Sequence, residues 1–208
     1  LLLLSGQVSA PEKVSGPYLG QEVPGIKPER FAPGIIPDDL HSVPVFTPDG
    51  KLVFYKTLEG DNIMIRRELR DKWTNAKPLF DDGTMENSDD PCLSPDGSCI
   101  FFSSYDKDAN RDFIYCYEFG NETKSAPQMP AGRLNELDLH WQFSIADNGN
   151  VYYASNGNIY ISEFNTGVYA EPTRLDTNIN TDLSECTPYV SPDETMLIFS
   201  RSVNGKPD

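Results

Sequence analysis

Short apolar runs alternate with turn residues along the whole chain, and this pattern predicts β-strands. Runs rich in Val, Ile, Phe and Tyr cover residues 51–57, 99–104, 150–155 and 195–200, each just after a tight-turn signal. Such residues fit the pleated, half-buried surface of a sheet. Further strands are expected at 62–69, 112–119 and 158–164, each after a polar hairpin link. No convincing amphipathic helix is seen, so the pattern predicts an all-β chain.

The turn before each apolar run belongs to an internal repeat. The sequence reads Thr-Pro-Asp-Gly at 47–50, Ser-Pro-Asp-Gly at 94–97 and Ser-Pro-Asp-Glu at 191–194, and a degenerate copy follows Ser144. Proline presets φ at the first central position, Asp caps the local backbone, and Gly accepts a positive φ. We therefore expect structural turn roles for Asp49, Gly50, Asp96, Gly97 and Asp193.

The spacing of the copies predicts the architecture. Anchored on Thr47, Ser94, Ser144 and Ser191, the copies lie 47, 50 and 47 residues apart. A weaker strand near a proline ends each of the first three copies, as suits the edge of a sheet. Each copy then supplies four antiparallel strands, which is one blade of a β-propeller. Blades are expected at 42–84, 85–134, 135–181 and, incomplete, 182–208.

Segment 17–41 is expected to take part in closing the ring. Residues 27–31, Lys-Pro-Glu-Arg-Phe, resemble residues 171–175, Glu-Pro-Thr-Arg-Leu, which fall in the fourth strand of the third copy. The segment is therefore expected to carry a lone outer strand that completes the last blade. Because Asp208 falls within the fourth copy, we expect a chain truncated from a six-bladed ring of about 300 residues. A closed four-bladed ring is the alternative.

The N-terminus resembles the end of a secretory signal peptide. Residues 1–10 read Leu-Leu-Leu-Leu-Ser-Gly-Gln-Val-Ser-Ala, four leucines followed by small and polar residues. We expect residues 1–16 to be a signal-peptide remnant and leader, and the protein to be periplasmic or secreted. A leader with chance leucines is the alternative. No other segment is long and apolar enough to span a bilayer.

The charge balance bears on partners. The chain has 32 acidic and 17 basic residues, a formal net charge of −15, and no compensating basic stripe. Such a surface repels nucleic acid and anionic membranes, so we expect neither as a partner. We expect the protein to be a monomer. Its expected partner is a protein, peptide or glycan.

The cysteines form no Cys-x-x-Cys pair, which argues against a zinc or redox motif. They are Cys92, Cys99, Cys116 and Cys186. Buried free thiols are expected. A disulfide between Cys92 and Cys99, which flank one tight turn, is the alternative in an exported protein.

The repeat resembles the TolB-type, WD-like propeller repeats of exported bacterial proteins. The resemblance covers roughly residues 27–208 and rests on Ser-Pro-Asp-Gly at 94–97 followed by Ile-Phe-Phe-Ser-Ser at 100–104, and on Ser-Pro-Asp-Glu at 191–194 followed by Leu-Ile-Phe-Ser at 197–200. It implies the propeller fold. Related propellers act as periplasmic scaffolds, as accessory domains of peptidases, or in unknown roles, so the resemblance does not choose a function.

Candidate ligand residues gather in the loops that lead into the predicted inner strands. The copies can be aligned on Pro44, Pro91, Trp141 and Pro188. In this alignment one column lies three residues before the aligned position, and a second column lies one residue before it. Positions two apart on a strand share a face, so both columns should point toward the channel. The charged or imidazole members of these columns are His41, Asp90, Asp138, His140 and Glu185. The alternative is that these are solvated polar loops whose histidines hydrogen-bond neighbouring blades.

Two functions remain open from the sequence. The first is a non-enzymatic binding or scaffold protein that presents a polar, acidic channel mouth and requires no cofactor, although imidazole with carboxylate could hold a divalent cation. The second is a carbohydrate-active hydrolase or lyase that uses the same acids and histidines as general acid and base. Nucleophile motifs of the Gly-x-Ser-x-Gly type and phosphate-binding Gly-rich loops are absent from the sequence.

Overall fold

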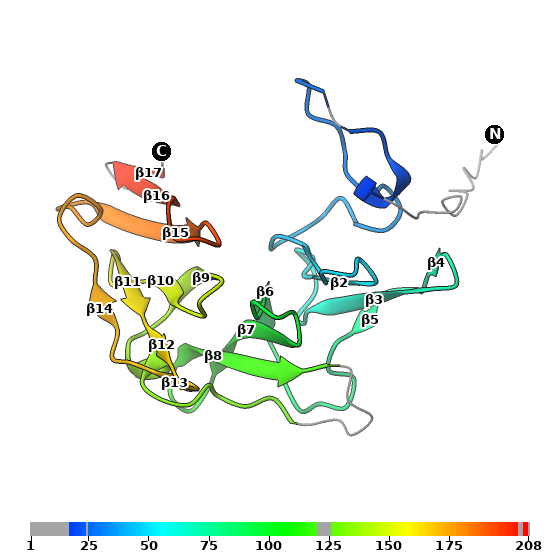
Figure 1. Ribbon diagram of the computed structural model, residues 1–208. Helices are drawn as coiled ribbons and strands as arrows, with labels where there is room; N and C mark the ends of the chain where they lie inside the picture. The colour runs from blue at the N-terminus through cyan, green and yellow to red at the C-terminus, as the bar shows by residue number, and fades with distance from the viewer. Residues whose placement is uncertain (1–16, 24, 120–125, 204–205, 208) are drawn as a thin grey trace, which may run out of the picture.

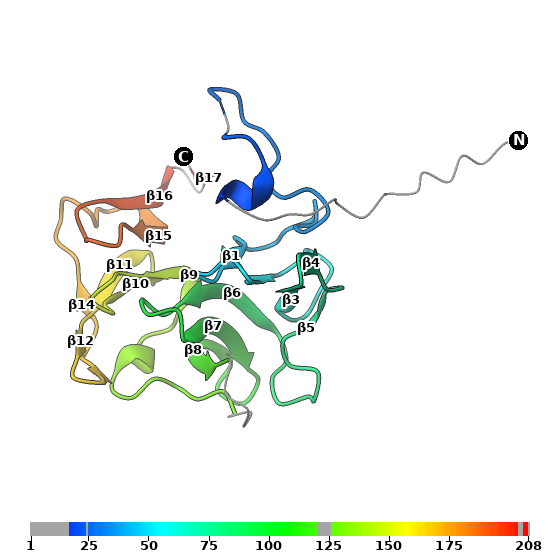
Figure 2. The ribbon, with the colours of Figure 1, turned by 45° about the vertical axis from the view of Figure 1, so that its right-hand side comes forward.

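The computed structural model describes residues 17–23, 25–119, 126–203 and 206–207. The expected signal-peptide remnant at 1–16 lies outside this part. Within the described residues the regular elements are β-strands and two short 3₁₀ turns, η1 (Pro17–Gly20) and η2 (Leu134–Glu136). Figures 1 and 2 show the sheets following one another in chain order along an arc. No helix in the described part is long and apolar enough to cross a membrane.

The first two blades follow the predicted order. The strands of the first blade pair as β1-β2-β3-β5, and they are β1 (Val45–Phe46), β2 (Leu52–Tyr55), β3 (Met64–Leu69) and β5 (Lys77–Pro78). A small hairpin extends β3 to β4 (Lys72–Trp73). The second blade contains β6 (Ser88–Leu93), β7 (Cys99–Asp106) and β8 (Arg111–Glu118). Its fourth-strand position is held by a bridge between Cys116 and Gln128.

The third and fourth blades repeat this plan. The strands of the third blade are β9 (His140–Ile145), β10 (Val151–Ser155), β11 (Asn158–Ser162) and β14 (Thr173–Arg174), and a side hairpin is formed by β12 (Phe164–Asn165) and β13 (Val168–Tyr169). The strands of the fourth are β15 (Ser184–Val190), β16 (Leu197–Val203) and β17 (Lys206–Pro207). The strands of the described residues pair antiparallel, so the all-β fold of antiparallel blades that the sequence predicts is confirmed.

The same hydrogen bonds hold each repeated turn. In the first copy the Thr47 hydroxyl donates to Asp49 Oδ1 at 2.6 Å and accepts from the Leu52 amide at 3.0 Å. The Gly50 amide, at φ 67°, donates to the Thr47 carbonyl at 2.8 Å. The aspartates of the second and fourth copies accept the equivalent bonds, and they are Asp96 and Asp193. The turn thus joins two strands through its own side chains.

The third copy corrects the sequence alignment. The Gly149 amide donates to the Ala146 carbonyl at 2.9 Å, as Gly50 does to Thr47. The Asn148 side chain accepts from the Asn150 amide at 3.0 Å in the place of the turn aspartate. Ala146, and not Ser144, therefore occupies the anchor position. The anchors are Thr47, Ser94, Ala146 and Ser191, spaced by 47, 52 and 45 residues.

The hydrophobic cores lie between neighbouring blades, as expected of sheets that stack radially. Phe54 of β2 and Phe102 of β7 are both fully buried in the cluster between blades one and two. Phe101 of β7 and Tyr153 of β10 belong to the cluster between blades two and three. In the fourth blade the outward-facing Ile198 is 62% exposed.

Segment 17–41 differs from the expected outer strand. Its described residues contain no β-strand, and Pro33 and Ile36 form only an isolated bridge. Instead, Ala32 accepts hydrogen bonds from the Ile35 and Ile36 amides in a tight turn, which suits a Pro-Gly pair that cannot continue a ladder. The buried Ala32, Ile35 and Ile36 pack on β2 of the first blade. The segment therefore covers that blade and adds no strand to the fourth.

The four cysteines are free thiols in the structure, which favours the first of the two sequence-based alternatives. Phe101 of β7 pairs with Cys92 on β6 and with Cys116 on β8. Cys92 therefore stands opposite Phe101 and not opposite Cys99. Burial raises the pKa of the Cys92 and Cys116 thiols to about 11.

We expect these two thiols to be unreactive in the folded protein, because the thiolate is the reactive form. In a variant that carries Cys99→Ser and Cys186→Ser, Ellman's reagent at pH 8 should react with the native protein about 100-fold more slowly than with the urea-unfolded protein. Rapid reaction of both thiols without denaturant would contradict the burial seen here.

Candidate functional site

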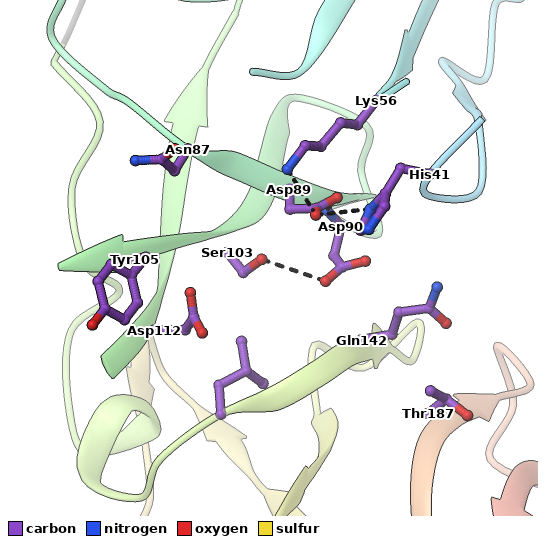
Figure 3. Close-up of a pocket in the computed structure, with 11 residues that line it drawn as sticks. His41, Lys56, Asn87, Asp89, Asp90, Ser103, Tyr105, Asp112, Gln142 and Thr187 are labelled. Carbon is purple, nitrogen blue, oxygen red and sulfur yellow. Dashed lines mark hydrogen bonds and ion pairs between the residues drawn. The ribbon is translucent and has the colours of Figure 1, made fainter. Parts of the chain in front are cut away.

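A cavity of about 540 Å³ opens where the loops that lead into the inner strands converge (Figure 3). We call it the outer cavity. Its walls come from all four blades and are mostly polar; they are formed by His41, Lys56, Asn87, Asp89, Asp90, Ser103, Tyr105, Asp112, Leu139, Gln142 and Thr187. Two of the candidate ligand residues that the sequence predicts for the channel mouth, His41 and Asp90, lie in these walls.

One position of the repeat supplies three cavity residues. Counted four residues before the structural anchors Thr47, Ser94, Ala146 and Ser191, this position holds Val43, Asp90, Gln142 and Thr187. Asp90, Gln142 and Thr187 line the outer cavity. Val43 lines a smaller cavity beside it. This repeat position thus presents one side chain from each of the second, third and fourth blades to a shared space.

A β-bulge aims two of these side chains. In β6 the register shifts between Asp89 and Cys92, and in β15 it shifts between Cys186 and Tyr189. The bulged residues Asp90 and Thr187 both adopt φ 48°, which is unusual for residues other than glycine. A bulge breaks the two-residue alternation of a strand and redirects a side chain. The two aligned columns therefore do not share one face, contrary to the sequence-based expectation.

Asp89 is the centre of a partly buried ion-pair network. His41 Nδ1 lies 2.9 Å and Lys56 Nζ lies 3.0 Å from the same oxygen, Asp89 Oδ2. The side chains of Lys56 and Asp89 are only 15% and 17% exposed, so solvent screens this pair weakly. The Lys56 ammonium and the His41 imidazole of the outer cavity therefore face one carboxylate.

Asp90, the next residue, lacks such a partner. Its carboxylate accepts a long hydrogen bond, 3.4 Å, from the Ser103 hydroxyl, and it forms no ion pair within the described residues. Burial, and after it the charge of Asp89, raises the pKa of Asp90 to about 6, because His41, Ser103 and Lys56 oppose the shift only in part. Of these two neighbouring carboxylates, Asp89 thus has a cationic partner in Lys56 and Asp90 has no ion pair within the described residues.

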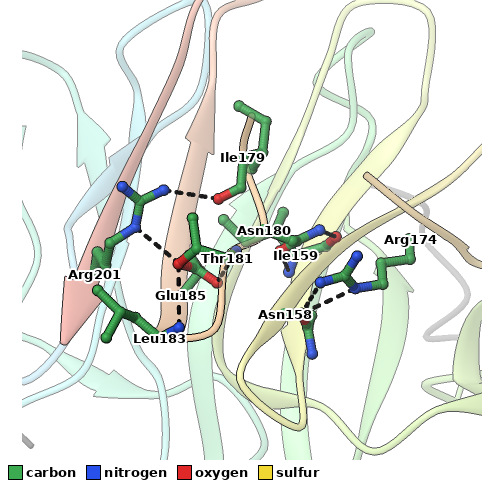
Figure 4. Close-up of polar contacts among 9 residues, drawn as sticks. All are labelled: Asn158, Ile159, Arg174, Ile179, Asn180, Thr181, Leu183, Glu185 and Arg201. Carbon is green, nitrogen blue, oxygen red and sulfur yellow. Dashed lines mark hydrogen bonds and ion pairs between the residues drawn. The ribbon is translucent and has the colours of Figure 1, made fainter. Parts of the chain in front are cut away.

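The remaining predicted site residues lie elsewhere. Asp138 is exposed and forms an ion pair with Arg111 at 3.0 Å. Glu185 is fully buried and is held by Arg201 and Thr181 beneath the loop of the fourth blade (Figure 4). His140 begins β9, but its side chain lies outside the described part of the structure. Of the four candidates whose side chains the structure describes, His41 and Asp90 line the outer cavity and Asp138 and Glu185 do not.

The predicted divalent cation finds no support in this arrangement. Among the described residues there is no group of three or more His, Cys, Asp or Glu side chains placed to hold a metal ion. Sequence reasoning also missed several wall residues, namely Lys56, Asp89, Asp112 and Gln142. Gln142 could have been found by aligning the turn glycines, because Gly149 marks the third turn as Gly50 and Gly97 mark the first two.

A second cavity of about 140 Å³ lies beside the first, between the inner strands, and we call it the inner cavity. It shares Asp90 and Gln142 with the outer cavity. Its other walls are mainly apolar and are formed by Ser42, Val43, Val45, Pro91, Cys92, Phe143, Ser144, Pro188 and Tyr189. The Ser42 hydroxyl is buried and has no hydrogen-bond partner among the described residues.

Comparison with known proteins identifies the class of fold. No family model matches the chain, and no curated protein matches it. A gluconolactonase from Xanthomonas campestris superposes with a TM-score of 0.53 at 10% identity, over 76% of this chain and 53% of that chain. A dihydro-heme d1 dehydrogenase gives 0.49 at 17% identity, over 81% of this chain and 35% of that one.

A putative 6-phosphogluconolactonase from Bacteroides fragilis gives a TM-score of 0.41 at 21% identity, covering 76% of this chain and 41% of that one. The chain thus spans about half the length of the gluconolactonase. With the repeated antiparallel sheets, the likeness places the protein in the β-propeller class. At these identities the likeness shows the fold alone.

Proposed function

We propose that this protein is an exported propeller of the TolB type that binds a peptide, protein or glycan at its outer cavity. The observation that carries the proposal is the convergence of one repeat position, Asp90, Gln142 and Thr187, on a shared polar cavity. Concave sites with a few convergent polar groups are the usual form of a ligand site. The leucine-rich start of the chain supports export, and the Ser-Pro-Asp-Gly turns support the TolB type.

The electrostatics of Asp90 support a binding role. A carboxyl whose folded pKa is raised above its unfolded value is less stable in its ionised form inside the fold. Above about pH 6 the ionised Asp90 therefore lowers the stability of the folded state. Such a group is typical of a functional site, where binding and not stability sets the choice of residue.

Carbohydrate hydrolysis or elimination is the second candidate. Asp90, with its pKa near 6, stands beside Asp89, which the Lys56 ammonium contacts. One carboxyl that can donate a proton beside one that stays ionised is the pattern of a general acid with a charge stabiliser. Only turnover separates this candidate from simple binding.

The test uses Asp90→Asn, which keeps the shape and removes the charge. We expect the wild-type protein to bind members of a peptide and glycan panel, and the variant to lose about tenfold or more in affinity, as removal of a charged hydrogen-bonding group does. Asp147→Asn, in the exposed turn of the third blade and outside the walls of both cavities, is the matched control and should bind as wild type.

Outcomes of this test separate the two candidates. Binding without turnover supports the binding protein, whereas glycan cleavage that Asp90→Asn abolishes supports the hydrolase. Equal binding by wild type and Asp90→Asn would remove the outer cavity as the site.

A further inference from the structure

We propose that the two cavities together bind an alkylammonium group, such as a lysine side chain or a free alkylamine, with its charged head against Asp90 and its hydrocarbon stem in the inner cavity. This inference rests on the proposed function and names the ligand chemistry of the same site. It follows from three features of the described residues: the charge of the outer cavity, the walls of the inner cavity, and the residues that the two share.

The charge of the outer cavity favours a cation. Its ammonium group, on Lys56, and its imidazole, on His41, both contact Asp89 Oδ2. Asp90 receives only the 3.4 Å hydrogen bond from Ser103 and has no ion pair within the described residues. Figure 3 shows Asp90 and Asp112 on different walls of the same space. An anionic ligand would meet carboxylates whose cations are already engaged, whereas an ammonium group would give Asp90 the partner it lacks.

The inner cavity favours a hydrocarbon stem. Val43, Val45, Phe143 and Tyr189 form much of its wall. Val43 is 66% and Tyr189 is 61% exposed, so apolar surface faces solvent at this place. Covering such surface with an aliphatic chain is favourable in proportion to the area removed from water. A small polar sugar would leave these side chains without an apolar partner.

The Ser42 hydroxyl is an independent sign of a ligand. Ser42 is only 4% exposed and lines the inner cavity. Its hydroxyl has no hydrogen-bond partner among the described residues. A buried polar group without a partner is costly and uncommon in folded proteins. A polar group of the ligand beside the stem, such as the amide of a peptide, would satisfy this hydroxyl.

The shared residues allow one molecule to reach both cavities. Asp90 and Gln142 belong to the walls of each. An ammonium group bound at Asp90 therefore lies where the two cavities meet, and its hydrocarbon stem can enter the inner cavity directly. The bulge that gives Asp90 its φ of 48° is what places its carboxylate at this junction and not in the ladder.

The experiment measures binding of hexylammonium, hexanol and ethylammonium by NMR titration of the whole chain at pH 7.5. We expect hexylammonium to bind at least tenfold more tightly than hexanol, which lacks the charge, and than ethylammonium, which lacks the stem. The affinity for hexylammonium should fall about tenfold in Asp90→Asn and should not change in Asp147→Asn. The affinity should also fall as the pH is lowered through about 6, because Asp90 becomes protonated.

A second variant tests the inner cavity by itself. Val43→Ser, at an exposed position, should weaken hexylammonium severalfold and leave ethylammonium unchanged, because only the longer chain reaches this wall. N-acetyl-lysinamide distinguishes a peptide source from a free amine: binding as tight as that of hexylammonium favours the peptide, and weaker binding favours the small amine.

Equal binding of hexanol and hexylammonium, or no effect of Asp90→Asn on hexylammonium, would overturn the inference. If instead the peptide and glycan panel binds in an Asp90-dependent way while hexylammonium does not, the proposed function stands and the alkylammonium assignment fails. If neither the panel nor the amines depend on Asp90, both fail.

Discussion

Replacing Phe54 with alanine is expected to lower the free energy of unfolding by about 3–5 kcal/mol, the usual cost of removing a buried aromatic ring. Phe54 is fully buried in the core between the first and second blades. Its ring centroid lies 5.0 Å from that of Phe119, across the boundary between the two blades. Because each sheet is too thin to cover its own faces, a cavity here weakens the contact that holds the blades together. Urea unfolding followed by tryptophan fluorescence measures the change.

The repeat supplies a matched control for this prediction. Phe54 faces Val45 in the ladder of the first blade, and Ile198 faces Tyr189 at the equivalent place in the fourth. Ile198 is 62% exposed, so Ile198→Ala should change the free energy of unfolding by no more than about 0.5 kcal/mol. A loss below about 1 kcal/mol for Phe54→Ala, or equal losses for the two variants, would contradict blade-to-blade packing as the main source of stability.

The sequence was sufficient for the fold because the turn carries its own chemistry. A side-chain oxygen at Thr47 or Ser94 closes the loop, and an aspartate two residues later caps it, so residue types at fixed spacing identify the turn. The third copy was misaligned because Ala146 has no hydroxyl and the backbone alone makes the bond. Gly149 is the signal that remained, since its φ of 91° is rare for other residues.

The site could be predicted only in part, for two physical reasons. A bulge adds a residue without a change in hydrophobic period, so the sequence pattern did not show that Asp90 and Thr187 leave the alternation of their strands. Lys56 and Asp112 reach the cavity from the end of one strand and the start of another, in different blades. The packing of the first blade on the second brings Lys56 to the cavity, and the pairing of β8 with β7 brings Asp112 there; no local spacing in the sequence records either.

Glu185 was predicted as a site residue, but in the structure it stabilises the fold. It is fully buried, and Arg201 Nε donates to its Oε1 at 2.8 Å while Arg201 Nη2 donates to the Ile179 carbonyl at 2.8 Å (Figure 4). The Thr181 hydroxyl donates to the same Oε1 at 2.6 Å. Burial opposes ionisation of Glu185, but these hydrogen bonds outweigh it and hold its pKa below the usual value.

Arg201→Met is therefore expected to lower the free energy of unfolding by about 2–4 kcal/mol at pH 7, because it leaves a buried carboxylate without its cation. This loss of stability lies toward the lower end of the usual cost of breaking a buried ion pair, because a third of the Arg201 side chain is exposed to solvent. Arg174→Met is the matched control: Arg174 is exposed and its guanidinium donates to the Asn158 side chain, so a change of about 0.5 kcal/mol or less is expected.

The pH dependence distinguishes this pair from simple packing. The folded pKa of Glu185 lies below its unfolded value, near 4.5, so the stability that it contributes is complete above that value and is lost as the pH falls through the folded pKa. In Arg201→Met the buried carboxyl should prefer its neutral form, which reverses the sign of its contribution. The gap in unfolding free energy between wild type and variant should therefore narrow from pH 7 to pH 4. A gap that stays constant over this range would mean that Arg201 acts through its hydrocarbon packing, with Glu185 uncharged already in the wild type.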